Sequence, residues 1–204
     1  MLPPLITKQL VTILGEERLL LRSEDLQYYG LDRTTIWQAN PCAVVLPGSI
    51  KEVQQIILLA KEHNLAIVPS GGRTGLSGGA VAKDGEIVMA LDRLNKIREF
   101  NPLDRTVTVG AGMITENLQN FAVEQGLFYP VDFASTGSSQ IGGNIATNAG
   151  GINVIRYGMT RQWVAGLTVV TGAGDILELN RGLMKNNTGY DFRHLFIGSE
   201  GTLG

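Results

Sequence analysis

A glycine-rich loop is the first part of the chain whose residue types and spacing suggest chemistry. The segment PSGGRTGLSGG runs from Pro69 to Gly79, and five of the ten residues from Ser70 onward are glycine. Successive glycines leave backbone N–H groups free of side-chain crowding, and such an array forms a concavity that binds anions. Hydrogen bonds to a charged group contribute about 1.5–3 kcal/mol each, so several of these donors could hold a diphosphate. The alternative interpretation is a glycine-rich turn without a ligand.

A second segment, STGSSQIGGNIATNAGG, runs from Ser135 to Gly151 and combines glycines with short hydroxyl and amide side chains. This mixture offers donors to a phosphate, a ribitol chain or the polar edge of a ring, and it carries no group that must ionise. Further along, Glu200 lies in the sequence GSEGT. This carboxylate either binds a ribose or ties down a turn, and the residue types leave both interpretations open.

Two better-known nucleotide motifs are absent or incomplete. The loop at 69–79 lacks the Lys-Ser/Thr pair that ends a P-loop. Gly110-Ala111-Gly112 begins like a nicotinamide-binding fingerprint, and Asp132 stands near the distance of a ribose-binding acid, but Thr115 replaces the third glycine. We therefore interpret residues 110–112 as a tight strand-to-helix turn, with Thr115 as the N-cap of the helix.

Composition excludes several classes of protein. The chain has 204 residues, 44% of them hydrophobic and 18% charged, as expected of a globular protein. Its net charge of −2 provides no basic field for nucleic acid. His63, His194 and the single Cys42 supply neither a hydrolytic triad, nor an internal disulfide, nor a zinc site. No apolar run approaches the ~20 residues of a membrane span, so we expect a cytoplasmic protein, with peripheral membrane association left open.

The elements that must position these segments begin with a strand, a helix and a strand. Residues 1–34 are expected to form a helical segment. Ala43–Leu46 is a short apolar strand, and Ser49 followed by Glu52 is a capping box that opens a helix. A second strand over 66–68 leads directly into the glycine loop. Such a βαβ unit is right-handed, so its two strands should be parallel.

Later elements indicate a second lobe. We expect lobes over about 35–100 and 101–204, and the hairpin turn is expected on Gly172, Gly174 and Asp175. The remaining expected elements are strands at 86–91, 96–100 and 105–109, a helix at 115–125 and a β-hairpin at 163–179.

Five motifs follow one another along the chain: PSGGRTGLSGG at 69–79, IGGNIATNAGG at 141–151, RYG at 156–158, NNTGYD at 186–191 and LFIGSEGTLG at 195–204. Together they resemble the FAD-binding domain of the vanillyl-alcohol oxidase/PCMH superfamily. The similar branch holds glycolate oxidase flavoprotein subunits, FAD-linked D-lactate dehydrogenases and D-2-hydroxyglutarate dehydrogenases. The resemblance implies an α+β, two-lobed PCMH-type domain at 35–204 with the cofactor extended between the lobes. Its first lobe would contain the parallel βαβ unit, and its second a mainly antiparallel sheet with helices.

The resemblance also implies which residues bind FAD. One group matches the diphosphate loop, a second runs along the diphosphate toward the isoalloxazine, and a third lies near the adenosine part. Some members bond a histidine of the loop covalently to the flavin; Arg73 stands at that position here, so non-covalent FAD is expected. The first group is Pro69, Ser70, Gly71, Gly72, Arg73, Thr74 and Gly75; the second is Ala134, Ser135, Thr136, Gly137, Ser138, Ser139, Gln140, Gly142, Gly143, Thr147, Asn148 and Gly150; the third is Glu200 and Gly201.

The activity that the resemblance implies is oxidation of a D-2-hydroxy acid to the 2-oxo acid by hydride transfer to the flavin. The electrons would pass to a quinone, an electron-transfer flavoprotein or a similar acceptor. The family's C-terminal substrate domain, with its catalytic base and metal site, is expected beyond Gly204. We therefore name no catalytic residue and no metal ligand, and we expect the chain alone to be inactive. An apolar face left by the missing domain could support a homodimer.

Three other functions remain open at this point. One is a non-catalytic flavin-binding subunit of a multi-chain oxidase. Another is a different reductase of the same FAD fold, such as a cell-wall amino-sugar reductase. The third is a nicotinamide-binding protein, which depends only on Gly110 and Gly112.

Overall fold

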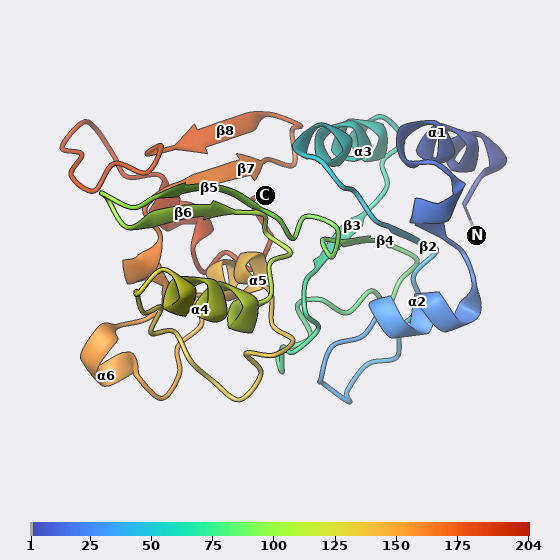
Figure 1. Ribbon diagram of the computed structural model, residues 1–204. Coiled ribbons are helices and arrows are strands. Elements are labelled where there is room, and N and C mark those ends of the chain that lie inside the picture. The colour runs from blue at the N-terminus through green and yellow to red at the C-terminus, as the bar shows by residue number, and fades with distance from the viewer. Residues whose placement is uncertain (1) are drawn as a thin grey trace. The chain divides into compact units, whose positions relative to one another are not determined.

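The computed structural model describes residues 2–204, which form two compact units (Figure 1). The first unit comprises the chain up to Leu94 together with the turn Gly172–Asp175. The second unit comprises Asn95–Thr171 and Ile176–Gly204. The first boundary therefore falls between Leu94 and Asn95.

The first unit is built on a four-stranded sheet with the order β1-β2-β4-β3. Strands β2 (Ala43–Val45) and β3 (Ile67–Ser70) both pair in parallel with β4 (Ile87–Ala90), which lies between them. The expected parallel arrangement is confirmed, with a third strand inserted between its two members. Every residue of β2 and β4 is buried, as is usual for parallel strands covered on both faces.

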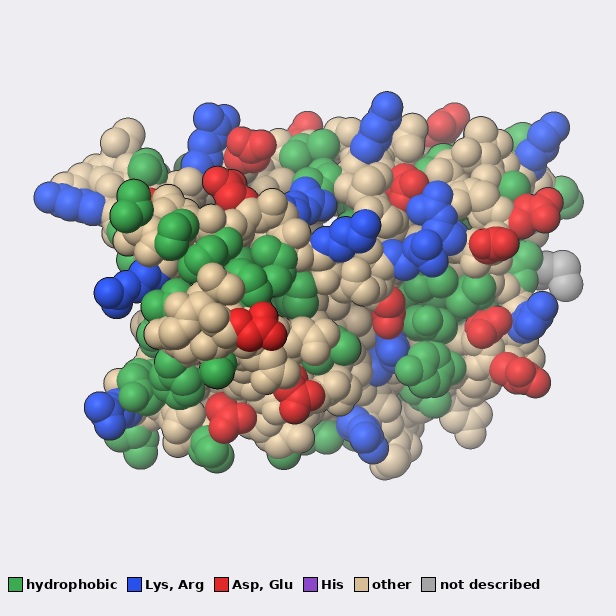
Figure 2. Space-filling view, viewed as in Figure 1, with side chains coloured by type: hydrophobic (Ala, Val, Ile, Leu, Met, Phe, Trp, Pro, Cys, Tyr) green, Lys and Arg blue, Asp and Glu red, His purple; other side chains and the backbone are tan. Residues whose placement is uncertain are grey.

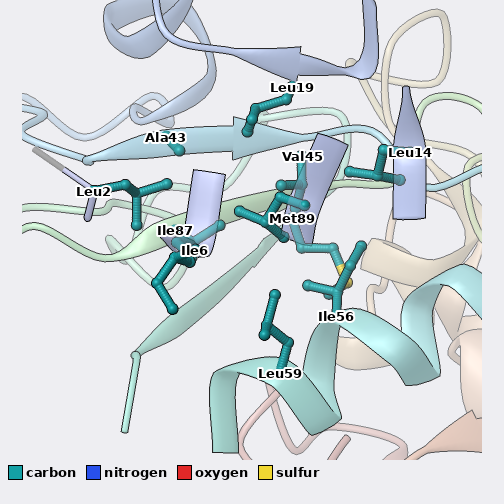
Figure 3. Packing of buried hydrophobic residues seen from close by; sticks show 11 residues of the cluster. Leu2, Ile6, Leu14, Leu19, Ala43, Val45, Ile56, Leu59, Ile87 and Met89 are labelled. Atoms are coloured by element: carbon teal, nitrogen blue, oxygen red, sulfur yellow. The ribbon is translucent and has the colours of Figure 1, made fainter. Parts of the chain in front are cut away.

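Helices cover each face of this sheet. On one face, apolar residues of α1 (Pro4–Leu14) and α3 (Ile50–Glu62) pack against Ala43, Val45, Ile87 and Met89 (Figure 3). The alternate residues Val44, Val88 and Ala90 face a second cluster that includes Leu26 and Tyr29 of α2 (Ser23–Tyr29). The alternation of side chains along a strand thus gives the sheet two apolar faces.

The start of α3 follows the expected capping pattern with one change. Ser49 Oγ accepts a hydrogen bond from Glu52 N at 3.2 Å, as a capping residue should. The Glu52 carboxylate, however, accepts from Gly48 N at 2.6 Å and from Arg18 at 2.7 Å. Burial alone would raise the pKa of Glu52, but the hydrogen bonds from Arg18 and Gly48 outweigh it and lower that pKa below its ordinary value.

The opening segment is not helical throughout, so that expectation is wrong in part. Gly15, with φ of 82°, ends α1, because a left-handed backbone cannot continue a right-handed helix. A short 3-10 helix (Glu16–Arg18) then leads into β1 (Leu19–Leu20), which pairs antiparallel with β2. Two apolar residues at an edge give too short a pattern to reveal a strand from sequence.

The second unit contains two antiparallel hairpins and several short helices. Strand β5 (Ile97–Asn101) pairs with β6 (Thr106–Val109), and β7 (Leu167–Val170) with β8 (Ile176–Leu179). The sequence predicts the hairpin of β7 and β8. It also predicts strands β5 and β6, but not their pairing. Met113, Leu118 and Ile141 form its buried cluster. The helices are α4 (Thr115–Glu124), α5 (Ile141–Ala146), α6 (Val154–Tyr157), the 3-10 helix Thr160–Trp163 and α7 (Arg193–Phe196).

The viewed face carries basic, acidic and hydrophobic side chains, and several basic side chains lie near one another in its upper part (Figure 2). The distribution agrees with the 17 basic and 19 acidic residues of the chain.

Candidate cofactor site

The glycine loop leaves the sheet at the carboxyl end of β3, which is where ligands bind in open parallel sheets. Within residues 2–204, none of the backbone N–H groups from Gly71 to Gly75 donates to a protein acceptor. Ser70, the last residue of β3, is fully buried, and its Oγ also has no hydrogen-bond partner in that range. Polar groups in such positions normally find partners, so these donors are available to a ligand.

The end of the glycine loop contacts Asp32, Arg33 and Trp37, which the sequence analysis did not single out. Gly78 has φ of 80°, and its N–H donates to Asp32 Oδ2 at 3.0 Å. Arg33 N donates to the carbonyl of Gly75 at 2.9 Å. A Cβ on Gly78 would lie 2.0 Å from the ring of Trp37, so only glycine fits beneath that ring. These contacts fix where the loop ends.

The second predicted segment contains a helix that the sequence did not reveal. Helix α5 begins at Ile141, inside IGGNIATNAGG, where two glycines obscure the helical pattern. Gly142 N donates to Ala111 O at 2.7 Å, and a Cβ on Gly142 would lie only 2.7 Å from Ala111 Cβ. The turn 110–112 thus packs closely against α5. This contact explains the turn without a nicotinamide ligand.

A buried polar network fixes the residues that precede α5. Thr115 Oγ1 lies 2.8 Å from Ser139 Oγ and accepts from Asn144 Nδ2 at 2.6 Å. Thr115 is therefore not the N-cap: Ile114 holds that position, and the Thr115 hydroxyl bonds inside the unit instead. Gln140 is also buried, and its Oε1 has no partner among the described residues. Ser70 and Gln140 are thus two buried polar side chains in the predicted site segments that lack a hydrogen-bond partner among the described residues.

The turn before this network presents more free donors. Ser138 N and Ser139 N both donate to Ser135 O, which closes the turn. The N–H groups of Ala134, Ser135 and Gly137, by contrast, have no acceptor in the described part of the chain. The residues from 134 to 138 are exposed or half-buried, so a ligand can reach these groups.

The C-terminal predicted residues lie beside the end of α5. Glu200 N donates to Ala146 O at 2.8 Å, and Gly198 N to Ile145 O at 3.1 Å. Thr147 Oγ1 bonds back to Gly143 O, while Asn148 Oδ1 accepts from Arg161 N at 3.0 Å. Glu200 is exposed, and its carboxylate makes no hydrogen bond or ion pair with residues 2–204. The structure thus brings Glu200 next to Thr147 and Asn148.

A charged cluster that the sequence did not single out secures this C-terminal stretch. Arg193 donates to the carbonyls of Val164 and Ala165 and pairs with Asp191. The hydrogen bonds from Arg193 lower the pKa of Asp191 to about 2. Arg161 donates to the carbonyl of Ile197 at 2.6 Å. The motifs NNTGYD and LFIGSEGTLG therefore include residues whose contacts are structural.

Two further observations concern metals and membranes. Among residues 2–204, no group of three or more His, Cys, Asp or Glu side chains is arranged to hold a metal ion. No helix in the described part of the chain is long and apolar enough to cross a bilayer. Cys42 is half-buried and packs against the core of the first unit.

Solved structures share this fold. Alkyldihydroxyacetonephosphate synthase superposes with a TM-score of 0.89 at 24% identity, covering 100% of this chain and 39% of that one. p-Cresol methylhydroxylase with bound substrate superposes with a TM-score of 0.75 at 20% identity, covering 94% and 40%. The chain thus shares the fold of these two proteins, which agrees with the fold that the sequence motifs implied.

The sequence relatives carry names from the branch that the sequence motifs resemble. A D-2-hydroxyglutarate dehydrogenase of Xanthomonas citri pv. viticola is 64% identical over 187 residues, which are 92% of this chain and 40% of that protein. The mitochondrial D-2-hydroxyglutarate dehydrogenase of Arabidopsis thaliana is 41% identical, covering 94% and 34%. Glycolate oxidase subunit GlcD of Bacillus subtilis is 39% identical, covering 98% and 42%. The chain therefore spans less than half the length of these relatives.

The FAD-binding domain family matches residues 41–180 of the chain. The chain belongs to that family, and the family's cofactor is FAD. The residues of the candidate site fit FAD. The free N–H groups from Gly71 to Gly75 suit the acceptor oxygens of a diphosphate, and the orphaned Ser70 Oγ lies at the start of the same run. FAD also offers hydroxyl and N–H donors that could satisfy Gln140 Oε1.

The close approach of α5 to residue 111 yields a test of this description of the second unit. Gly142→Ala should destabilise the chain by about 1–3 kcal/mol, because the new methyl group would press on Ala111. Gly143→Ala is the matched control, since a Cβ there meets nothing within 4 Å and alanine favours helix. Urea unfolding measures both variants. Equal stabilities of the two variants would contradict the described packing.

Proposed function

We propose that the chain binds FAD without a covalent bond. The observation that carries this proposal is the run of five N–H groups without acceptors, from Gly71 to Gly75, beside the buried and unpartnered Ser70 Oγ. Arg73 occupies the position where some family members attach the flavin to histidine, and a guanidinium forms no such bond. Half-buried Cys42 packs in the core of the first unit.

In this proposal each predicted segment contributes to FAD binding. Residues 69–75 bind the diphosphate, and residues 134–140 continue along it with Gly142, Gly143, Thr147, Asn148 and Gly150. Glu200 and Gly201 lie near the adenosine part, where the free Glu200 carboxylate can accept from ribose hydroxyls. The flavin-binding region would then cover residues 35–204, with lobes at about 35–100 and 101–204.

We further propose that the protein oxidises a D-2-hydroxy acid. The support is the names of its relatives, D-2-hydroxyglutarate dehydrogenase and glycolate oxidase subunit. Bound FAD supplies the ring that accepts electrons. The residues described here hold that cofactor and orient it, and we assign no proton transfer to them. A quinone, an electron-transfer flavoprotein or a similar molecule would take the electrons.

Location and assembly are also proposals. We place the protein in the cytoplasm, whereas the Arabidopsis relative is named as mitochondrial. A homodimer stays a proposal as well. The Bacillus relative is named as a subunit, which favours one alternative, a flavin-binding subunit of a multi-chain oxidase.

Ser70 provides a sharp test of FAD binding. Ser70→Ala should weaken FAD binding about two- to tenfold, because one hydrogen bond to the ligand is lost. It should not lower the stability of the cofactor-free chain, because Ser70 Oγ has no partner there. Ser77→Ala, at an exposed position of the same loop, is the matched control. Flavin fluorescence titration and thermal unfolding measure the two effects.

Two results would contradict the binding proposal. The first is the absence of saturable FAD binding by the unaltered chain. The second is equal affinity of the Ser70→Ala and Ser77→Ala variants. Non-covalent binding is checked separately, by acid precipitation. Flavin should then stay entirely in solution, and a yellow pellet would contradict it.

A chimera tests the proposed reaction. This chain would replace the matching 40% of the Xanthomonas relative, to which it is 64% identical. The chimera is expected to reduce a dye with D-2-hydroxyglutarate and not with the L-enantiomer. The same chimera with Ser70→Ala should need more FAD for half-maximal rate. A chimera that folds and binds FAD, yet oxidises no D-2-hydroxy acid, would contradict the proposed activity.

A further inference from the structure

Arg73 stands in the middle of the free N–H groups in an unfavourable backbone conformation. Its φ is +57°, in the left-handed region that favours glycine. A side-chain-bearing residue there costs about 1–3 kcal/mol and persists only where surrounding contacts hold it. The neighbours of Arg73 should therefore show what stabilises this conformation.

The guanidinium of Arg73 is bound from several sides. Nη1 donates to the carbonyl of Gly71 at 2.8 Å, so the side chain closes back on its own loop. Nη2 donates to the Tyr28 hydroxyl at 3.2 Å and lies 3.5 Å from Asp92 Oδ1. The rings of Tyr28 and Tyr29 are nearly perpendicular, and the Arg73 Cζ lies 4.7 Å from each centroid. We call these four side chains the Arg73 clamp.

The clamp uses the charge of Arg73 inside the protein. Only 13% of the Arg73 side chain is exposed, against 32% for Asp92. Burial alone would lower the pKa of Arg73, but the Asp92 carboxylate and the Tyr28 hydroxyl outweigh it and raise that pKa. A guanidinium committed to Asp92, Tyr28 and Gly71 has few N–H groups left for a ligand. The loop's free backbone N–H groups are better placed for that role.

The residues that clamp Arg73 lie largely outside the family's matched range. Tyr28 and Tyr29 end α2, and the family model starts at residue 41. Asp32, which accepts from Gly78 N, and Arg33, which donates to Gly75 O, follow directly. One short segment before the family domain thus contacts the glycine loop at its middle and at its end.

We propose that Arg73 is a positioning residue: its clamp holds the loop so that the backbone N–H groups of 71–75 face an anion before that anion arrives. The guanidinium itself does not bind the diphosphate. This inference rests on the proposed binding of FAD. It adds that affinity depends on the planar guanidinium of Arg73 and on its partners Tyr28 and Asp92, and not on attraction between the charge of Arg73 and the diphosphate.

Four variants of the 204-residue chain test this inference. Arg73→Lys keeps the positive charge but removes the planar guanidinium. Tyr28→Phe removes the hydroxyl that accepts from Arg73, and Asp92→Asn removes the negative charge that pairs with it. Asp84→Asn is the matched control, because Asp84 is 72% exposed in the same unit. FAD and inorganic pyrophosphate are the two ligands titrated. We expect about tenfold weaker binding for Arg73→Lys, about two- to fivefold for Tyr28→Phe and Asp92→Asn, and no change for Asp84→Asn.

Trypsin supplies a readout that needs no cofactor. Because Arg73 is clamped, the unaltered chain should be cut slowly after this residue. Tyr28→Phe and Asp92→Asn should speed that cut about three- to tenfold. The cut after exposed Arg105 should keep its rate and serves as the internal standard.

The outcomes separate the inference from the proposed function. Full affinity in Arg73→Lys would mean that a plain charge suffices, and it would overturn the inference. Faster cutting with unchanged affinity would also overturn it, because the clamp would then be structural only. An unaltered chain that binds neither FAD nor pyrophosphate would contradict the proposed function and also the proposed role of Arg73 in binding. Weaker binding together with faster cutting supports the inference.

Discussion

Backbone N–H groups that the protein itself does not satisfy are the constraint on which this structure depends. A parallel strand ends at Ser70, and the backbone N–H groups of the next five residues donate to no acceptor in the described chain. Leaving polar groups without partners costs roughly 1–3 kcal/mol each where water is excluded. Such a run is maintained only when a ligand or solvent can satisfy it, and the surrounding contacts must keep the loop from collapsing onto other acceptors.

Those surrounding contacts explain much of the first unit. The sheet places the loop at its carboxyl edge, and the apolar faces described above fix the sheet. Asp32 and Trp37 determine where the loop ends, and Arg73 stabilises its middle. In the second unit the buried network of Thr115, Ser139 and Asn144 has a similar role, because it holds the residues before α5 in place. Rigid support of this kind keeps a binding segment in the geometry that its ligand needs.

Local patterns predicted the parts of the fold that depend on neighbours in sequence. The apolar run before Pro47 and the Ser49 cap defined β2 and α3, and the hairpin of β7 and β8 was recognisable from its turn residues. Strands β5 and β6 were predicted without their pairing. The glycine loop was found because its composition is itself the signal. Helix α5 and the two-residue β1 were missed, because glycines hide a helical pattern and two residues carry no pattern at all. Thr115 was misassigned as a cap because its partner Ser139 is 24 residues away. Tyr28, Asp32 and Trp37 are likewise distant in sequence from the loop that they contact.

The central claim is that the backbone of residues 71–75 receives the diphosphate of FAD. Amide proton and nitrogen chemical shifts of the isotope-labelled chain, recorded during an FAD titration, test it most directly. The account predicts that the amide protons of Gly71, Gly72 and Gly75 move downfield as they gain an acceptor, while Gly78, already bonded to Asp32, changes little. If flavin fluorescence reports binding while these loop signals stay where they are, the account is wrong.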